Sequence, residues 1–304
     1  MLDYGASRLV NEMSRNSTLR RLLEKPGIIL APGATDAFVA KIIERTKFPV
    51  VYVTGAGVSN TLGLPDLGLT SMNDIVTRAK CIVDAVNVPV ISDADTGYGN
   101  ALNVMRTVRE FESAGVSGIH IEDQVMPKRC GHFEGKQLIS KAEMVKKIEA
   151  AVEARRDKDF VIIARTDARA PYGLDEAISR AKAYLKAGAD AAFVEAPTTV
   201  DELKTIAKSI DAPLIANMVE GGKTPLVKAS ELEEMGYKIA IYANTALRVS
   251  AYAIREAMMV LQKTGTTEQL MDRMLAWQDR QDFVDLPLYQ QLEKRFLSLD
   301  PTDE

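Results

Sequence analysis

Residues 88–97 read VPVISDADTG, a short apolar run that passes directly into two carboxylates. The apolar side chains of this run do not alternate with polar ones, which is typical of a strand buried on both faces of a parallel sheet. Seven more runs of this kind occur along the chain: GIILAPGA (27–34), PVVYVTG (49–55), GIHIEDQ (118–124), FVIIARTDA (160–168), AAFVEAP (191–197), PLIANM (213–218) and KIAIYAN (238–244). The sequence therefore predicts eight parallel strands.

Helical patterns occupy the intervals between these runs. Examples are residues 103–116, 141–155, 174–190 and 200–210, and several of them end at a glycine that can cap a helix in the left-handed conformation. Eight strands that alternate with helices predict an α/β fold, a (β/α)8 barrel of the TIM type. No segment rich in Pro, Gly or Ser divides the chain, so we expect one barrel domain over residues 1–304.

The chain continues past the predicted eighth strand for longer than one closing helix requires. From about residue 246 we expect a C-terminal helical extension with two helical stretches, residues 250–265 and 268–283. These stretches have apolar faces that something must cover, and a neighbouring subunit is the natural candidate.

Composition narrows the class of protein. A net charge of −4, with 46% hydrophobic and 26% charged residues, is typical of an ordinary globular protein and disfavours a nucleic-acid partner. No stretch approaches the roughly 18 consecutive apolar residues of a membrane span, and residues 1–21 lack the apolar run of a signal peptide. We therefore expect a cytoplasmic protein without a membrane partner.

The two cysteines, Cys81 and Cys130, lack the spacing of a zinc or redox site, so each is expected to be a free thiol. Cys81 lies in the apolar helical run 75–86 and is expected in the core. Cys130 lies in a loop beside Lys128, Arg129 and His132. Positive surroundings would lower the pKa of its thiol and let it exchange a proton with a carbanion. The alternative is an inert loop cysteine.

The barrel prediction locates the chemistry, because active sites of this fold lie at the carboxyl ends of the strands. Those ends carry Thr54, Asp93, Asp95, Glu122, Asp123, Arg165, Asp167, Glu195 and Asn217. Asp93 and Asp95, two residues apart, would point the same way on a strand, and Glu122 would join them from the next one. Such an oxygen-rich cluster suits Mg²⁺ or Mn²⁺ better than zinc. A solvated acidic rim or a set of helix caps is the alternative.

Two further residues have two interpretations each, and one glycine-containing stretch has a single one. Arg165 could hold a substrate carboxylate or form structural ion pairs with Glu195 or Asp167. His132 could act on the substrate or only fix its loop. The TGAG stretch at residues 54–57 brings backbone amides near a strand end, although it lacks the spacing of a dinucleotide site. His120, inside an apolar run, is expected to be buried and satisfied locally.

Four motifs carry a resemblance to a known family: DADTGYGN (93–100), IEDQVMPKRCGHFEGK (121–136), IIARTDAR (162–169) and NMVEGGKTP (217–225). From about Gly33 to its end, the chain resembles the isocitrate lyase and phosphoenolpyruvate mutase superfamily. The K-[KR]-C-G-H pattern is typical of the carbon–carbon lyase branch. The chain looks most like the short enzymes that cleave 2-methylisocitrate or 2,3-dimethylmalate. Carboxyphosphonoenolpyruvate mutase shares the cysteine loop and the last motif.

The resemblance implies roles for individual residues. Asp95 would contact Mg²⁺ directly, and three carboxylates would hold it through water: Asp93, Asp66 and Glu122. The oxo-acid would be seated by Thr54, Gly55 and Ala56, in a pocket lined by Arg165, Glu195 and Asn217. A mobile gating loop would contain Lys128, Cys130, Gly131 and His132, with Cys130 as general acid. The resemblance also implies a homotetramer whose barrels exchange their last helix.

The implied reaction is a Mg²⁺-dependent cleavage of a 2-hydroxy di- or tricarboxylate to pyruvate and a carboxylic acid, with no organic cofactor. Phe133 and Glu134 stand where many methylisocitrate lyases have a basic residue, which favours a smaller dicarboxylate such as a 2,3-dialkylmalate. Residues 54–57 and 242–245 also depart from the methylisocitrate lyase pattern. The alternatives are a phosphonomutase, an oxaloacetate decarboxylase and a barrel that only binds metabolites.

Overall fold

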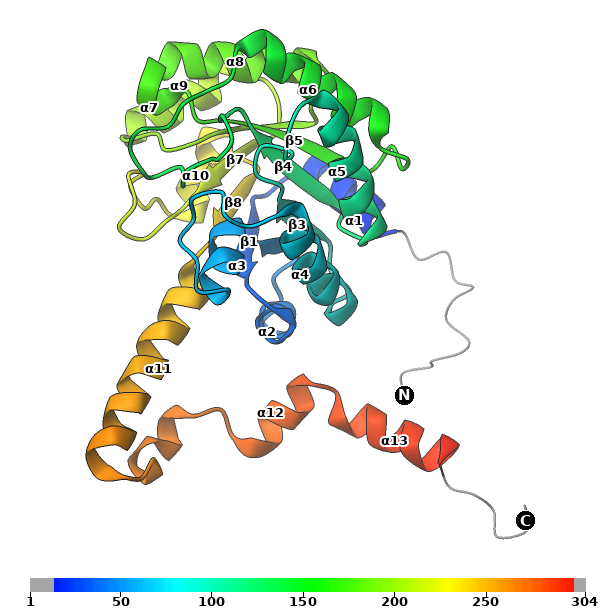
Figure 1. Cartoon of the computed structure of the whole chain (residues 1–304), viewed down its shortest axis with the longest axis vertical. Helices are drawn as coiled ribbons and strands as arrows, with labels where there is room; N and C mark the ends of the chain where they lie inside the picture. Colours follow the sequence, from blue (N-terminus) through cyan, green and yellow to red (C-terminus); the bar gives the residue numbers. More distant parts are fainter. Residues whose placement is uncertain (1–13, 298–304) are drawn as a thin grey trace. The chain divides into compact units, whose positions relative to one another are not determined.

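The carboxyl ends of eight parallel strands meet at one rim of a closed barrel whose strands pair in the order β1-β2-β3-β4-β5-β6-β7-β8 (Figure 1). This computed structural model describes residues 14–297. The strands are β1 (Ile29–Ala34), β2 (Val51–Val53), β3 (Val90–Asp93), β4 (Gly118–Glu122), β5 (Val161–Thr166), β6 (Ala191–Val194), β7 (Leu214–Asn217) and β8 (Ile239–Tyr242). Each lies within one of the eight apolar runs, so the predicted (β/α)8 barrel is confirmed.

The helices of the barrel follow the strands along the chain. They are α1 (Arg15–Glu24), α2 (Ala37–Arg45), α3 (Gly55–Thr61), α4 (Met72–Ala85), α5 (Ala101–Ser113), α6 (Lys141–Ala154), α7 (Arg169–Tyr172), α8 (Leu174–Lys186), α9 (Val200–Ser209) and α10 (Ala229–Met235). Helix α5 begins two residues before the predicted start, because Asn100 and Asn103 form a capping box there. Gly115 and Gly188 follow helices with positive φ, as predicted, and Gly236 does so after α10.

The seam between β1 and β8 closes the barrel. Pro32 of β1 pairs with Tyr242 of β8 in parallel register. A Cβ atom on Gly33 would lie 2.0 Å from the carbonyl oxygen of Ala243, so only glycine allows the two backbones this approach.

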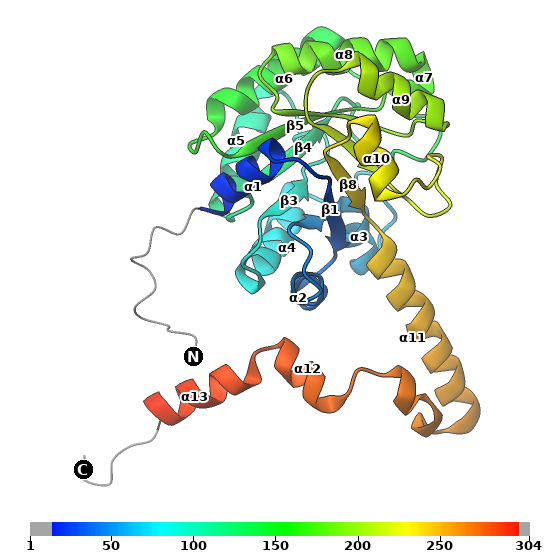
Figure 2. The same ribbon diagram turned by 180° about the vertical axis from the view of Figure 1, so that it is seen from behind.

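Helix α1, which the sequence patterns did not predict, contributes to the interior of the barrel. Leu19 of α1 is fully buried in one apolar cluster with inward-facing strand residues such as Ile29, Val161 and Ile239. Figure 2 shows α1 beside β5 on this side of the barrel. The side chain of Leu19 therefore fills space that the strand residues alone would leave open.

The prediction that Cys81 is a core residue is wrong, because its side chain is exposed. The buried face of α4 consists of Ile75, Ala79, Ile82 and Val83, which are three, four or seven residues apart. Cys81 lies off this stripe, since each residue of a helix turns the side chain by about 100°. The apolar run correctly predicted a helix, but it did not predict which face of that helix carries Cys81.

The chain divides into two units between Leu247 and Arg248. The second contains most of α11 (Thr245–Thr264), then η2 (Glu268–Arg273), α12 (Trp277–Phe283) and α13 (Leu286–Phe296). The predicted single helix over residues 268–283 is wrong. Met274 adopts an extended backbone conformation, and Ala276, with a ψ of 150°, also lies outside the helical region, so the two residues separate the 3₁₀ turn η2 from α12.

Large apolar side chains are exposed throughout the second unit, and Leu270 is the only buried residue among residues 248–297. Val249, Ile254 and Trp277 are 63%, 60% and 72% exposed. Within the described residues, no helix combines the length and apolarity needed to cross a membrane. Residues 1–13, on which the expectation about the start of the chain largely rests, lie outside the described residues.

Candidate active site

A small cavity lies at the carboxyl ends of the strands and has a volume of about 40 Å³. The loop after β4 forms one of its walls. The lining residues are Tyr52, Thr54, Ala56, Asp66, Asp93, Lys128, Cys130, Gly131, His132, Arg165, Glu195, Asn217, Val219, Ala243 and Asn244. The structure thus brings most of the predicted site residues into one cavity. Gly55, Asp95 and Glu122 do not line it but lie directly beside residues that do.

The first acids are placed by a turn and not by strand alternation. Strand β3 ends at Asp93, and Asp95 lies beyond it with a φ of 46°. A carboxylate oxygen of Asp93 accepts a hydrogen bond of 2.9 Å from the backbone N–H of Asp95. The expectation that both side chains point the same way along a strand is therefore wrong. Gly55 makes room for this turn, since a Cβ there would lie 2.5 Å from Asp93 Oδ2.

Lys128 supplies the cation that these carboxylates contact. Its ammonium lies 2.6 Å from Asp66 Oδ1 and 2.8 Å from Asp95 Oδ1, and the lysine side chain is only 4% exposed. Burial nevertheless raises the pKa of Asp95 to about 6 and also raises the pKa values of Asp93 and Glu122. The cluster therefore contains more carboxyl groups than Lys128 can neutralise, and burial favours their protonated forms.

The chemistry of this cluster fits a hard divalent cation. Asp95 Oδ2 and both carboxylate oxygens of Glu122 are buried and accept no hydrogen bond from any described residue. Oxygen ligands of this kind suit Mg²⁺. No three Asp, Glu, His or Cys side chains within residues 14–297 enclose an ion by themselves. An ion here would therefore keep several of its waters, as Mg²⁺ usually does.

Arg165, at the end of β5, forms ion pairs with three acids. Two hydrogen bonds of 3.0 and 3.1 Å join its guanidinium to Asp167, while Glu122 and Glu195 each lie 3.3 Å away. These charges hold the pKa of Arg165 well above its usual value despite its burial. The structural ion pairs that the sequence left open are therefore present, and the same guanidinium also lines the cavity.

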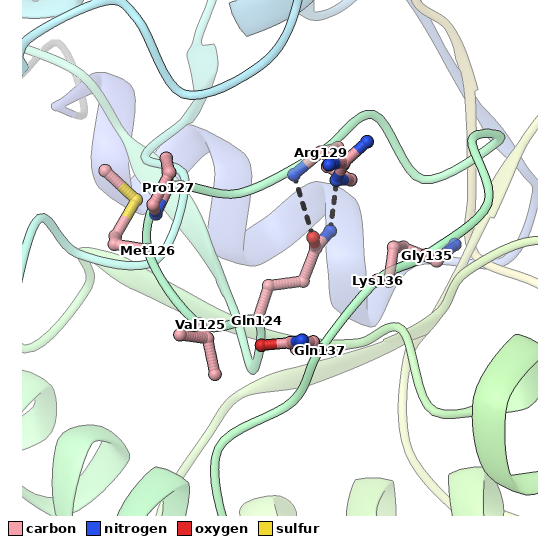
Figure 3. Close-up of a pocket in the computed structure, with 8 residues that line it drawn as sticks. All are labelled: Gln124, Val125, Met126, Pro127, Arg129, Gly135, Lys136 and Gln137. Atoms are coloured by element: carbon pink, nitrogen blue, oxygen red, sulfur yellow. Dashed lines mark hydrogen bonds between the residues drawn. The ribbon is translucent and has the colours of Figure 1, made fainter.

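The loop after β4 is tied to the barrel at several points. The side-chain amide of Gln124 bonds both the backbone N–H and the carbonyl of Arg129, at 2.9 and 2.8 Å (Figure 3). The N–H of Cys130 donates to the carbonyl of Asp66 at 3.2 Å. Cys130 thus lies at the cavity wall in a position fixed by its backbone.

The predicted lowering of the Cys130 pKa is wrong. Burial, reinforced by the charge of Asp66, raises the pKa of the thiol to about 11. The neighbouring cations do not counter this effect, because Lys128 is engaged by Asp66 and Asp95 and Arg129 is exposed. Proximity in the sequence suggested positive surroundings, whereas the folded loop surrounds the sulfur with acids. The thiol is therefore protonated at neutral pH and has a proton to give.

His132 is held by the loop after β7. The backbone N–H of Lys223 donates to His132 Nδ1 at 3.1 Å, and Nε2 lies 3.5 Å from Glu195 Oε1. A Cβ on Gly222 would come within 2.9 Å of the imidazole, so glycine permits this contact. Because Nδ1 accepts a hydrogen bond, the proton of the neutral ring is on Nε2 and faces Glu195.

His120 is fully buried, as expected. Its Nε2 is hydrogen-bonded to the hydroxyl of Tyr52 at 2.8 Å, and Nδ1 lies 3.6 Å from Asp93 Oδ1. Tyr52 and Val219 line the cavity but were not predicted as site residues, whereas Ala243 and Asn244 belong to the stretch 242–245 that the resemblance placed at the border of the pocket. Tyr52 could have been found, because it is two residues before Thr54 on the same strand run and therefore faces the same side.

With this geometry established, comparison with known proteins places the chain. A family profile described as phosphoenolpyruvate phosphomutase matches residues 19–261. The chain belongs to the phosphoenolpyruvate mutase/isocitrate lyase superfamily. It is 48% identical to 2,3-dimethylmalate lyase of Eubacterium barkeri, over 93% of this chain and 99% of that one. It is 47% identical to 2-methylisocitrate lyase of Aeropyrum pernix, over 91% and 88% of the two chains.

Solved structures of superfamily members agree. A crystal structure of 2,3-dimethylmalate lyase superposes with a TM-score of 0.88 at 37% identity, over 93% of this chain and 95% of that one. Oxaloacetate acetylhydrolase with 3,3-difluorooxalacetate gives 0.89 at 33% identity, over 94% and 98%. Phosphonopyruvate hydrolase with oxalate and Mg²⁺ gives 0.86 at 31%, over 94% and 100%. The predicted enzyme class, a carbon–carbon lyase, is consistent with these relatives, and the alternative of a binding-only barrel loses its support.

The state of His132 can be tested by titration. Burial, the largest effect, lowers its pKa, although the charge of Glu195 opposes the shift. We expect a ring that stays neutral as the pH falls through the usual histidine range near 6.5, with Nδ1 unprotonated. Nitrogen-15 spectra of labelled histidine would measure this, since the chain has only two histidines. A ring that is doubly protonated at pH 6.5 would contradict the described contact with Lys223.

Proposed function

We propose that the chain is a Mg²⁺-dependent lyase that cleaves a 2-alkylmalate-type 2-hydroxy acid to pyruvate and a second carboxylic acid. The observation that carries this proposal is the position of the half-buried Cys130 thiol, whose pKa is raised to about 11, in the wall of a cavity that also contains Arg165 and Glu195. A raised thiol pKa suits a proton donor and not a nucleophile, which must be a thiolate.

Substrate binding would use the residues around the cavity. The first amide groups of α3, at Gly55 and Ala56, have no acceptor within the helix and would bind an oxygen of the oxo-acid half. Arg165 would bind the carboxylate of the other half with its guanidinium, which Asp167 holds in place. Asn217, whose amide donates to Glu195 at 3.3 Å, would complete the wall opposite the loop.

The metal would be held by Asp95, with Asp93, Asp66 and Glu122 contacting its water ligands. Bound Mg²⁺ lowers the pKa of a coordinated hydroxyl and stabilises the charge that develops as that oxygen becomes a ketone. The proposal gains support from the buried carboxylate oxygens that lack hydrogen-bond donors. It is also consistent with the Mg²⁺ in the phosphonopyruvate hydrolase structure.

The cleavage itself breaks the bond between the hydroxyl-bearing carbon and its neighbour. The hydroxyl proton would pass to a carboxylate of the acid cluster, the oxygen would become the ketone of pyruvate, and the bonding electrons would pass to the neighbouring carbon. Arg165 would stabilise the resulting carbanion by binding the carboxylate attached to that carbon. Cys130 would then give its thiol proton to that carbon, releasing the acid. The loop would exclude water until this transfer is complete.

A dicarboxylate fits the loop better than a tricarboxylate. Glu134 is exposed and forms an ion pair with Lys223 across the two loops that border the cavity. The acid at this position, and its engagement of a nearby lysine, disfavour a third substrate carboxylate there. Among the substrates of its relatives, 2,3-dimethylmalate therefore fits better than 2-methylisocitrate.

The first test is an assay for pyruvate over 2,3-dimethylmalate, 2-methylisocitrate, citramalate, isocitrate and oxaloacetate. We expect pyruvate from 2,3-dimethylmalate at the highest kcat/KM. Cys130→Ser should lower the rate by about 100- to 10,000-fold, the usual contribution of a positioned proton donor. Cys81→Ser is the matched control and should keep the wild-type rate, because Cys81 is exposed on α4.

Two outcomes would contradict the lyase. Oxaloacetate turnover that survives Cys130→Ser would indicate a decarboxylase. If folded protein with Mg²⁺ forms no pyruvate from any of these acids, the result would favour phosphonate substrates and a mutase.

The metal proposal has its own test. We expect Mg²⁺ to raise the melting temperature, and chelation followed by Mg²⁺ or Mn²⁺ to remove and restore activity. Asp95→Asn should weaken Mg²⁺ binding by more than about 10-fold in calorimetry, since even outer partners of a metal contribute 10- to 100-fold. Asp84→Asn, an exposed carboxylate on α4, is the control. Equal affinity in Asp95→Asn and wild type would refute the assigned ligand.

We also propose a homotetramer in which the second unit of each chain is covered by another copy. The exposed apolar side chains of α11 and α12 support this assembly, since a stable protein rarely leaves so many in water. Light scattering coupled to gel filtration should give about four times the mass of one chain. Truncation after residue 247 should give a species of lower mass than the tetramer. A monodisperse monomer would contradict the proposal.

A further inference from the structure

Lys136 joins the loop after β4 to the end of β5. Its ammonium donates to the carbonyl of Gly131, in the middle of the loop, and lies 3.3 Å from Asp167 Oδ1. The lysine side chain is 1% exposed and Asp167 is fully buried. A buried lysine is retained in a fold only when its charge and its hydrogen bonds are satisfied. These two acceptors, one on the loop and one on the barrel, meet that requirement.

Asp167 is itself held rigidly by the barrel. Its backbone N–H donates to Asp123 Oδ1 at 2.9 Å, and the hydroxyl of Thr166 donates to Asp123 Oδ2 at 2.7 Å. Asp167 also receives the two hydrogen bonds from Arg165. One carboxylate thus orients the arginine of the cavity and, through Lys136, the carbonyl next to Cys130.

The two arms of the loop have little apolar packing between them. A second cavity of about 180 Å³ lies between them, lined by Gln124, Val125, Met126, Pro127, Arg129, Gly135, Lys136 and Gln137 (Figure 3). Val125 and Met126 are exposed at 39% and 37%. Since close packing does not fix the loop, its polar tethers must do so. Gln124 and Lys128 tether the first arm, His132 contacts the loop after β7, and Lys136 tethers the second arm.

We propose that Lys136 is a positioning residue, a latch that holds Cys130 at the cavity by joining the Gly131 carbonyl to Asp167. Removing the ammonium leaves Asp167 paired with Arg165, so no isolated charge is buried and the barrel keeps its fold. Gly131 then loses its tether, and the segment around it loosens, while Lys128 and His132 still hold the loop on either side. The half-buried thiol of Cys130 becomes more accessible to solvent.

Thiol alkylation tests the latch without any assumption about the reaction. The chain has two cysteines, and exposed Cys81 serves as an internal reference for Cys130. With iodoacetamide and peptide mass spectrometry, we expect Lys136→Met to raise the rate at Cys130 by at least about 10-fold and to leave Cys81 unchanged. Lys136→Arg, which keeps a cation, should restore much of the protection. Gln137→Ala, the exposed neighbour in the same loop, should match the wild type.

Several outcomes would overturn the latch. One is an unchanged Cys130 rate in Lys136→Met. Another is acceleration at Cys130 that is accompanied by loss of the folded circular dichroism spectrum, which would mean general unfolding; Cys81 does not report unfolding because it is already exposed. If Lys136→Met does not fold, Lys136→Gln replaces it, with the thermal midpoint measured by circular dichroism. A Cys130 rate that stays at the wild-type value in folded Lys136→Gln would equally refute the proposal.

The effect on catalysis rests on the proposed function and is measured separately. For pyruvate formation we expect Lys136→Met to lower kcat by at least about 10-fold with KM within about threefold, and Lys136→Arg to recover part of kcat. A raised KM with an unchanged kcat would overturn a role in positioning Cys130. Absence of activity in the wild type would refute the lyase while leaving the alkylation result intact, so the two failures are distinguishable.

Discussion

Buried negative charge at the rim of the barrel is the constraint on which the rest of the site depends. In the part of the chain that the structure describes, the acids that meet there are Asp66, Asp93, Asp95, Glu122, Asp167 and Glu195, and the cations are Lys128, Lys136 and Arg165. Burial penalises the charged form of these carboxyls even where a cation lies beside them, which is why several of their pKa values are raised. The excess acid leaves capacity for a divalent cation.

The same constraint governs the loop that carries the thiol. Lys128 and Lys136 lie on either side of Cys130, and each reaches down to a carboxylate of the barrel. Removing one partner of a buried ion pair typically costs about 3–5 kcal/mol, so lifting the whole loop away from the acids is unfavourable. The ion pairs that neutralise the acids at the rim are therefore the same contacts that hold Cys130 at the cavity. A metal that binds Asp95 would compete with Lys128 for the same carboxylate and so shift this balance.

Cys130 and His132 show why neighbours in the sequence are a poor guide to electrostatics. The basic residues beside Cys130 suggested a lowered thiol pKa, but one of them is engaged by acids 33 or more residues away and another is exposed. What acts on the sulfur is burial and Asp66, which make it an acid at neutral pH. His132 is likewise defined by Lys223 and Glu195, which come from the loop after β7 and the end of β6.

The sequence by itself determined the barrel, the eight strands and the acids at their ends, because strand burial leaves a local pattern of apolar residues that needs no knowledge of distant partners. It also determined the superfamily through motifs such as residues 121–136. Only the tertiary structure decided which acid meets which cation, that Asp95 sits in a turn, that Cys81 faces outward and that residues 274–276 interrupt a helix. Those features depend on contacts and backbone angles that form when distant segments close on one another, and side-chain periodicity carries no record of them.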